Sequence, residues 1–231
     1  TLRDPDSLEL LEEMECETDG IAITADAAIA TEPLPLPESI LKRLPEGREY
    51  FAVSVRPLKG LNRGERARAP EEIYETVVSA VRVIADRRNA VPLFIPFAPE
   101  DVGLCEKLCR KAERGFVLPR MRAGHIISVI EKCSFTLGMR LHSAVFSSIA
   151  GVPAIMIAYD PKVAAFAKRA YHPAPLDPDR EDFSMRAIVA SAGALYTNMT
   201  AARSTLRART AELRRLTEAD KVIVEALYNA K

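Results

Sequence analysis

An arginine and a histidine two positions apart stand in the densest polar motif of the chain, Leu137-Gly-Met-Arg-Leu-His-Ser143. The motif follows a predicted strand and opens a predicted helix, so Arg140 and His142 are expected beside free backbone N–H groups that attract anions. The guanidinium offers a planar fork for carboxylate or phosphate. A histidine beside an anion tends to gain a proton and suits a general acid. The structural alternative is that Arg140 caps a neighbouring segment and His142 packs in the core.

Two further cations follow predicted strands. Lys162 lies in the first turn of a predicted helix, where the helix dipole disfavours a cation unless an anion is bound nearby. Arg56, in the run Ser54-Val-Arg-Pro57, lies at the end of the first predicted strand after the linker. The alternatives are a solvated lysine and a surface salt bridge. Strand ends of a parallel sheet meet at one edge, so we expect one rim to carry all four side chains: Arg56, Arg140, His142 and Lys162.

The remaining polar features are interpreted as turns, caps and a solvated loop. They are Arg3-Asp4 before a short helix, Asp26 after a short strand at 21–24, the segment 96–101, and the basic loop with Lys59, Arg63, Arg66 and Arg68. The isolated His125 and His172 favour structural roles.

The sequence lacks GxGxxG, Walker, GxSxG and HExxH motifs, so dinucleotide, ATP-hydrolysing and serine-hydrolase chemistry have no motif support. No ligand cluster suggests a metal site. The cysteines form no zinc pattern and are too sparse for a disulfide scaffold. We interpret them as free thiols in a reducing, cytoplasmic setting: Cys16, Cys105, Cys109 and Cys133.

Short apolar runs alternate with helical patterns along the chain. The expected strands are 50–55, 91–97, 115–118, 134–137 and 153–158, and the expected helices between and after them are 70–88, 100–112, 121–133, 140–150 and 161–169. This order predicts an α/β fold with a Rossmann-like parallel sheet and helices on both faces. Two closing helices are expected at 183–196 and 201–229, the last with an apolar stripe from Leu206 to Leu227.

Prolines at 33, 35 and 37 exclude regular helix and predict an extended linker. We therefore divide the chain into residues 1–30, a linker 31–47, a Rossmann-like domain 48–196 and a helical extension 197–231.

The composition fits a globular protein, with 231 residues, 48% apolar and 28% charged. Lys+Arg and Asp+Glu both total 32, and this balance argues against a nucleic-acid binder. No apolar run reaches the roughly 20 residues that span a bilayer. No signal peptide is visible, and because the chain begins Thr-Leu-Arg-Asp without Met, we interpret it as a fragment.

Three motifs in order, 138–143 (GMRLHS), 151–153 (GVP) and 159–163 (YDPKV), resemble the C-terminal signature of the polysaccharide pyruvyl transferase family. The subgroup that they resemble most modifies secondary cell-wall polymers that anchor bacterial surface-layer proteins. The resemblance runs from residue 1 to about 170 and includes the Leu2-Arg-Asp segment. It implies the C-terminal domain of a B-type glycosyltransferase-like fold, with residues 1–30 as the tail of an N-terminal domain that is otherwise missing.

The resemblance also implies a chemistry without a cofactor. Phosphoenolpyruvate is the donor, and its pyruvyl group forms a ketal on a sugar with release of phosphate. His142 is the expected catalytic proton donor, and the expected substrate-binding residues are Arg3, Arg56, Arg140, Ser143 and Lys162. The acceptor is a lipid-linked saccharide, commonly with N-acetylmannosamine, which places the enzyme in the cytoplasm at the inner face of the membrane. The basic loop at 59–68 would then meet a diphosphate or anionic lipid.

Two other functions remain open from the sequence. One is a nucleotide-sugar glycosyltransferase or 2-epimerase of the same architecture, which would bind its donor on the same rim. The other is a non-catalytic binding or oligomerisation module. Acceptor sugar, ketal stereochemistry and oligomeric state are left open.

Overall fold

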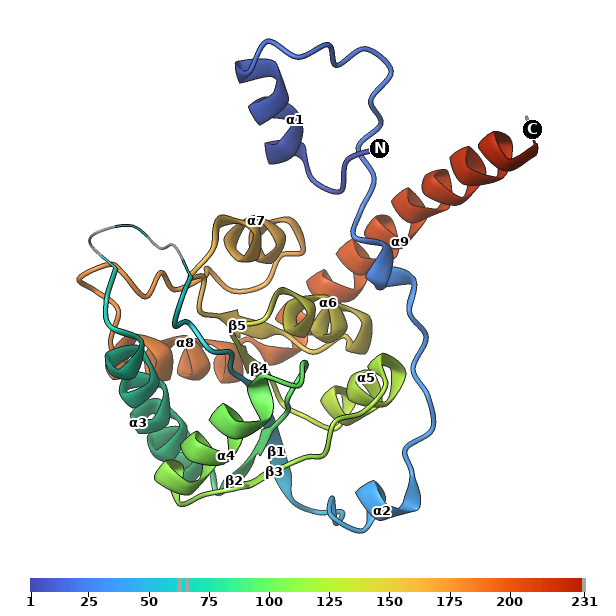
Figure 1. The fold of residues 1–231 in the computed structure, drawn as a ribbon. Coiled ribbons are helices and arrows are strands. Elements are labelled where there is room, and N and C mark those ends of the chain that lie inside the picture. The colour runs from blue at the N-terminus through green and yellow to red at the C-terminus, as the bar shows by residue number, and fades with distance from the viewer. Residues whose placement is uncertain (62–63, 65–66, 230–231) are drawn as a thin grey trace.

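A five-stranded parallel sheet lies at the centre of the chain (Figure 1), in the computed structural model that describes residues 1–61, 64 and 67–229. The strand order is β3-β2-β1-β4-β5. The strands are β1 (Glu49–Ser54), β2 (Ala90–Phe94), β3 (Phe116–Val117), β4 (Thr136–Gly138) and β5 (Ala154–Met156). The order reverses direction between β1 and β4, so this pair forms the topological switch point.

The strands form because their apolar runs are buried on both faces, as expected for a parallel sheet. Five of the six residues of β1 are buried, and so is every residue of β4 and β5. The register places Ser54, the last residue of β1, beside Gly138 of β4. The side chains that follow these two strands therefore emerge at the same edge.

Helices cover both faces of the sheet. One face is packed by α3 (Pro70–Arg88), α4 (Asp101–Ala112) and α8 (Met185–Thr197) around a core that includes Val53, Phe94 and Leu137. The other is packed by α5 (Ala123–Glu131), α6 (Leu141–Ala150) and the first half of α9 (Met199–Asn229). A further helix, α7 (Pro161–Arg169), contacts α6 and β5.

The N-terminal segment lies apart from the sheet (Figure 1). It holds α1 (Pro5–Glu13), whose residues are all at least partly exposed, and the 3-10 helix η1 (Ala27–Ala30), which packs on α6 and α9. The expected strand at 21–24 is wrong, because Ile23 makes only an isolated parallel bridge to Leu2. The linker is extended from 31 to 37 and then forms the short α2 (Glu38–Leu41).

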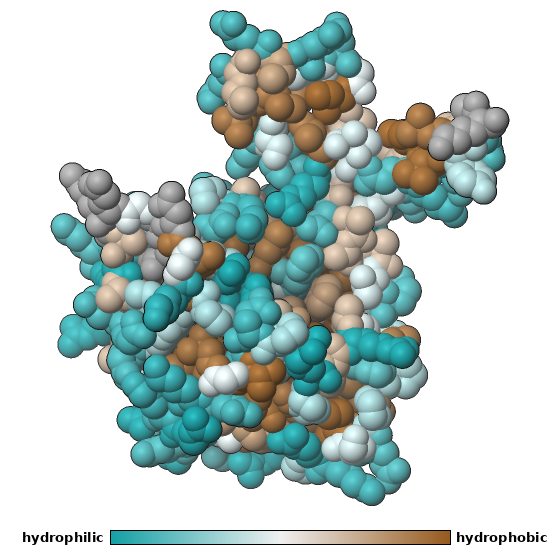
Figure 2. All heavy atoms as spheres, in the orientation of Figure 1, coloured by the Kyte–Doolittle hydropathy of each residue, from teal (hydrophilic) through white to brown (hydrophobic). Residues whose placement is uncertain are grey.

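The α/β fold class and the strand order along the chain are confirmed. The division into domains stays a prediction. The apolar stripe of α9 is only partly covered: Leu206 and Leu213 are buried, while Val222 and Leu227 are 64% and 66% exposed. In Figure 2 the projecting end of α9 carries apolar residues beside hydrophilic ones. None of the helices in the described part of the chain has the length and apolar character needed to cross a bilayer.

Candidate active site

The carboxyl ends of β1 and β4 form the edge where a doubly wound sheet leaves a crevice for ligands. The chain leaves β1 toward α3 on one face and leaves β4 toward α6 on the other. Arg56 lies two residues after β1, and Arg140 lies two residues after β4. The structure therefore brings these two arginines to the switch point, as the sequence predicts.

Arg140 is the N-cap residue of α6, and its side chain is held by two carboxylates. Nη2 donates to Asp101 Oδ1 at 2.5 Å and to Glu100 Oε1 at 2.7 Å, and Nε donates to Asp101 Oδ2 at 3.1 Å. Asp101 is fully buried and also accepts the backbone N–H groups of Phe97 and Ala98. Arg140 thus joins the start of α6 to the start of α4, which is the capping role that the structural alternative assigned to it.

Glu100 is the exposed member of this cluster. A backbone hydrogen bond, and then the hydrogen bond from Arg140, hold the pKa of Glu100 below its usual value. Glu100 is therefore ionised at neutral pH, and Arg140 faces two negative charges.

His142 lies in the first turn of α6 and is exposed, so the alternative of a packed core histidine is wrong. Its ring is tilted against Phe146, with centroids 5.9 Å apart. His142 and Arg140 line the same cavity of about 330 Å³, which has Phe97 and Ile126 among its apolar lining residues. The first turn of α6 thus brings an accessible imidazole and a guanidinium to one cavity.

The side-chain hydrogen-bond partner of Arg56 is a phenol and not a carboxylate. Its Nη1 donates to the hydroxyl of Tyr159 at 2.7 Å, and its guanidinium carbon lies 5.1 Å from the centre of that ring. Tyr159 follows β5. Its hydrogen bond with Arg56 therefore connects the carboxyl ends of β5 and β1.

Lys162 and Arg3 line a second, small hollow next to the first turn of α6, together with Leu141 and Asp26. Both cations have acidic partners: Lys162 Nζ lies 3.0 Å from Asp160 Oδ2, and Arg3 Nη1 lies 3.6 Å from Asp26 Oδ2. The sequence predicts an anion beside Lys162. In this structure that anion is the carboxylate of Asp160, which also caps α7.

Ser143 is fully buried, and its hydroxyl donates to the carbonyl of Arg140 at 2.6 Å. Gly138 makes room for it, because a Cβ there would collide with the Ser143 hydroxyl. This position supports the turn between β4 and α6, and the hydroxyl is closed to a ligand in this structure.

Sequence reasoning missed the partners of the two arginines, Asp101, Glu100 and Tyr159. The segments 96–101 and 159–163 stand out in the sequence, but only the fold shows which of their side chains contact Arg140 and Arg56. The described residues include no group of three or more His, Cys, Asp or Glu side chains able to hold a metal ion. Burial raises the pKa of the Cys105 thiol to about 12 and also raises the pKa of the Cys133 thiol. Both thiols are therefore unreactive.

The basic loop is only partly described. Arg63 and Arg66 lie outside the described residues. Arg68 donates to the backbone carbonyls of Arg180 and Phe183, and its guanidinium lies over the ring of Phe183. Arg68 therefore secures the segment before α8.

Solved structures with the same fold are sugar-modifying enzymes of low sequence identity. The pneumococcal O-GlcNAc transferase GtfA, in complex with UDP and GlcNAc, matches at 12% identity and a TM-score of 0.61, covering 98% of this chain and 44% of that one. Staphylococcus aureus MnaA with UDP matches at 10% and 0.62, covering 88% and 52%. A putative UDP-N-acetylglucosamine 2-epimerase from Listeria monocytogenes matches at 14% and 0.62, covering 96% and 59%. The chain thus spans about half the length of these enzymes, which share the B-type glycosyltransferase-like fold. No curated protein matches the chain.

The family model for polysaccharide pyruvyl transferase matches residues 1–161. The match includes β1, β4 and the start of α6 with Arg56, Arg140 and His142, and it ends one residue before Lys162. It therefore contains the switch point and the cavity that His142 lines. The chain belongs to the polysaccharide pyruvyl transferase family.

Proposed function

We propose that this chain takes part in transferring a pyruvyl group from phosphoenolpyruvate to a sugar of a lipid-linked cell-wall polysaccharide precursor. The product is a pyruvyl ketal, and the second product is inorganic phosphate. The acceptor class is that of the secondary cell-wall polymers that anchor surface-layer proteins, with N-acetylmannosamine as the sugar. The enzyme works in the cytoplasm, at the inner face of the membrane.

One observation carries the proposal: the imidazole of His142 is exposed on the wall of a cavity at the topological switch point of a pyruvyl transferase family chain. A proton donor for this reaction has to reach an open site, and His142 is at the position where doubly wound folds bind ligands. The other two histidines do not line this cavity; His172 is buried, with its ring nitrogens bonded inside the protein.

The reaction balances with one proton donor and no external oxidant or reductant. His142 protonates the methylene carbon of phosphoenolpyruvate, and the carbon that bears the phosphate becomes oxocarbenium-like. One sugar hydroxyl attacks that carbon, the bond to the phosphate oxygen breaks, and a second hydroxyl closes the ketal. Of the two hydroxyl protons, one ends on the new methyl group through His142, and the other ends on phosphate.

The donor carries a carboxylate and a phosphate, so it needs cations that are not already neutralised. Arg56 meets this need, because its hydrogen-bonded side-chain partner is the Tyr159 hydroxyl and not a carboxylate. Lys162 and Arg3 are half exposed, and each would exchange a carboxylate partner for the donor.

The test is phosphate release from phosphoenolpyruvate with a panel of lipid-linked disaccharides. His142→Ala should reduce turnover by about 10²–10⁴-fold, the usual contribution of a general acid. His125→Ala is the matched control, because His125 lies on α5 and lines none of the cavities described above. Arg56→Gln should raise the KM for phosphoenolpyruvate, whereas Arg215→Gln, an exposed arginine of α9, should not. Unimpaired phosphate release by His142→Ala would exclude the assigned role.

The second candidate is a UDP-sugar enzyme, because two structures with the same fold were solved with UDP. Product formation that requires a UDP-sugar and proceeds without phosphoenolpyruvate would favour it. A binding module would show thermal stabilisation by phosphoenolpyruvate with no turnover.

A further inference from the structure

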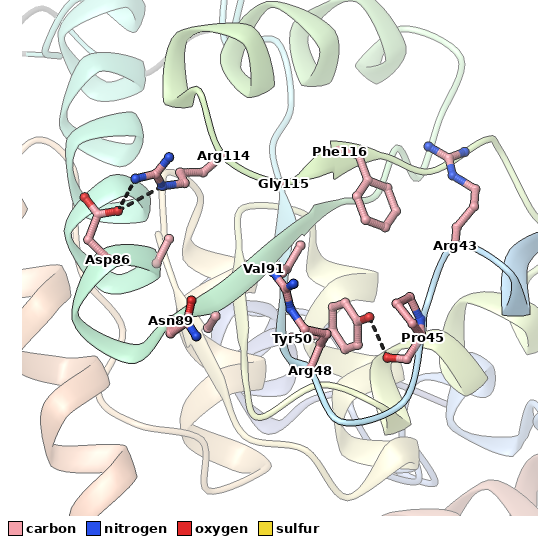
Figure 3. A pocket seen from close by; sticks show the side chains of 12 residues that line it. Arg43, Pro45, Arg48, Tyr50, Asp86, Asn89, Val91, Arg114, Gly115 and Phe116 are labelled. Atoms are coloured by element: carbon pink, nitrogen blue, oxygen red, sulfur yellow. Dashed lines mark hydrogen bonds and ion pairs between the residues drawn. The ribbon is translucent and has the colours of Figure 1, made fainter.

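A third cavity, of about 640 Å³, lies at the edge of the sheet opposite the candidate active site, where β1, β2 and β3 begin (Figure 3). Its walls come from the linker before β1, the end of α3 and the turn before β3. It shares no residue with the cavity beside His142. Ligands of doubly wound folds normally bind at the carboxyl edge, so the proposed pyruvyl transfer does not account for this cavity.

Three arginines surround the cavity, and two of them have no acidic partner in its lining. Arg114 is paired with Asp86, with Nη2 at 2.8 Å from Oδ1. Within the described residues, Arg43 donates only to the backbone carbonyl of Val117, and it lies over the ring of Phe116, 4.8 Å from its centre. Arg48 is exposed and makes no hydrogen bond or ion pair with any described residue. Three arginines against one aspartate leave the lining with a net charge of +2.

Helix ends do not explain this charge. The carboxyl ends of α3 and α4 lie nearby, and cations there offset the helix dipole. Arg87 and Arg88 do this for α3, and Arg110 for α4. Arg43 and Arg48 come from the segment between α2 and β1, and neither donates to the last carbonyls of α3 or α4 among the described contacts. Their convergence on the cavity therefore needs another reason.

The shape of the cavity depends on two unusual backbone positions. Gly115 has φ +74°, and a Cβ there would collide with the carbonyl oxygen of Pro92, so only glycine lets β3 approach β2 this closely. Asn89 ends α3 in the left-handed conformation with φ 50°. Figure 3 shows the rings of Tyr50 and Phe116 between Arg43 on one side and Arg48 with Arg114 on the other. The cavity thus offers guanidinium groups around two aromatic rings.

We propose that this cavity binds a small phosphate-bearing anion. Guanidinium groups bind phosphate oxygens through paired, charge-assisted hydrogen bonds, and they do so best where no carboxylate competes. The aromatic rings would contact a ring carried by the same ligand. The site lies at the edge of the sheet opposite His142 and shares no lining residue with the cavity there, so it is separate from the proposed donor site.

Inorganic pyrophosphate is the probe, measured by calorimetry and by amide shifts in an NMR spectrum of the whole chain. Binding should shift the amides of Asn89, Gly115 and Phe116. Arg48→Gln should weaken binding about tenfold, the typical effect of losing one charge-assisted hydrogen bond. It should leave the thermal midpoint unchanged, because the described part of the chain gives Arg48 no structural contact.

Arg110→Gln is the matched control, since it removes an equal charge from an exposed residue of α4 outside the cavity. His142→Ala should bind pyrophosphate at this site as the wild type does. Equal weakening by Arg48→Gln and Arg110→Gln would show non-specific attraction and overturn the proposal. So would amide shifts confined to the loops around His142, or no binding at millimolar pyrophosphate.

Discussion

Acid should destabilise this protein through His172, the buried histidine between α6 and β5. Its Nδ1 accepts the backbone N–H of Ala154 at 3.0 Å, and its Nε2 lies 2.9 Å from Ser148 Oγ and 3.1 Å from the carbonyl of Ala144. These contacts fix the tautomer, with the proton on Nε2. A second proton would have to go to Nδ1, where an N–H already points.

The size of the effect follows from the pKa. Burial lowers the pKa of His172 from 6.5 to about 4, although the Ala144 carbonyl opposes part of this change. The unfolded chain takes up a proton below pH 6.5, and the folded chain does not until about pH 4. Stability from this group is therefore complete above pH 6.5 and falls with decreasing pH. At 1.36 kcal/mol per pH unit, the loss is about 2 kcal/mol by pH 5 and about 3 kcal/mol by pH 4.

The assay is urea unfolding at pH 7, 6, 5 and 4.5, with His172→Asn as the comparison. The Asn oxygen can still accept the Ala154 N–H but does not titrate. The variant is expected to be less stable at pH 7, and its stability should decline less steeply below pH 6.5 by about the amounts given above. The carboxylates contribute equally to both proteins, so the difference isolates His172. His125→Asn, on a half-buried histidine, is the control. An identical pH dependence for His172→Asn and the wild type would refute the reasoning.

Three further substitutions test the packing around the site and the sheet. Asp101→Ala should cost about 3 kcal/mol in urea unfolding, because it leaves Arg140, with only 17% of its side chain exposed, without its buried partner. Gly115→Ala should cost about 2 kcal/mol or more and shift the thermal midpoint, owing to its positive φ and the collision with Pro92. Phe135→Ala should cost about 3–5 kcal/mol, since the ring is fully buried in the core; an unchanged denaturation midpoint for any of the three would contradict the packing described.

The sheet could be predicted because its strands are short apolar runs buried on both faces, a pattern that local sequence carries. The expected strand at 115–118 shrank to Phe116–Val117, because β3 is an edge strand that pairs only with β2. The exposure of the end of α9, by contrast, could not be predicted from the local sequence. Its apolar stripe has the right spacing for burial, but whether anything covers it depends on segments far away in the chain.

The candidate site could be predicted only as a set of strand ends. Arg56, Arg140 and His142 were found because each follows an apolar run, and parallel strands bring such positions together. Their partners could not be found, since Asp101 lies 39 residues from Arg140 and Tyr159 lies 103 from Arg56. Pairings at that separation depend on strand order, which local patterns do not contain.

The unequal surroundings of the two switch-point arginines separate their roles in the proposed reaction. The buried Asp101 carboxylate and Glu100 offset the charge of Arg140, so it adds little net attraction for a donor with two acidic groups. Its bonds instead fix the start of α6, and the first turn of that helix carries His142. The side-chain hydrogen-bond partner of Arg56 is a phenol, and although the exposed Glu100 is near enough for a charge interaction, no carboxylate of the described residues pairs with Arg56, so more of its charge is available to the donor. In the proposed reaction we therefore expect Arg140 to act on catalysis through the position of the imidazole and Arg56 to act on donor affinity directly, because a cation attracts an anion only to the extent that nearby carboxylates have not already neutralised it.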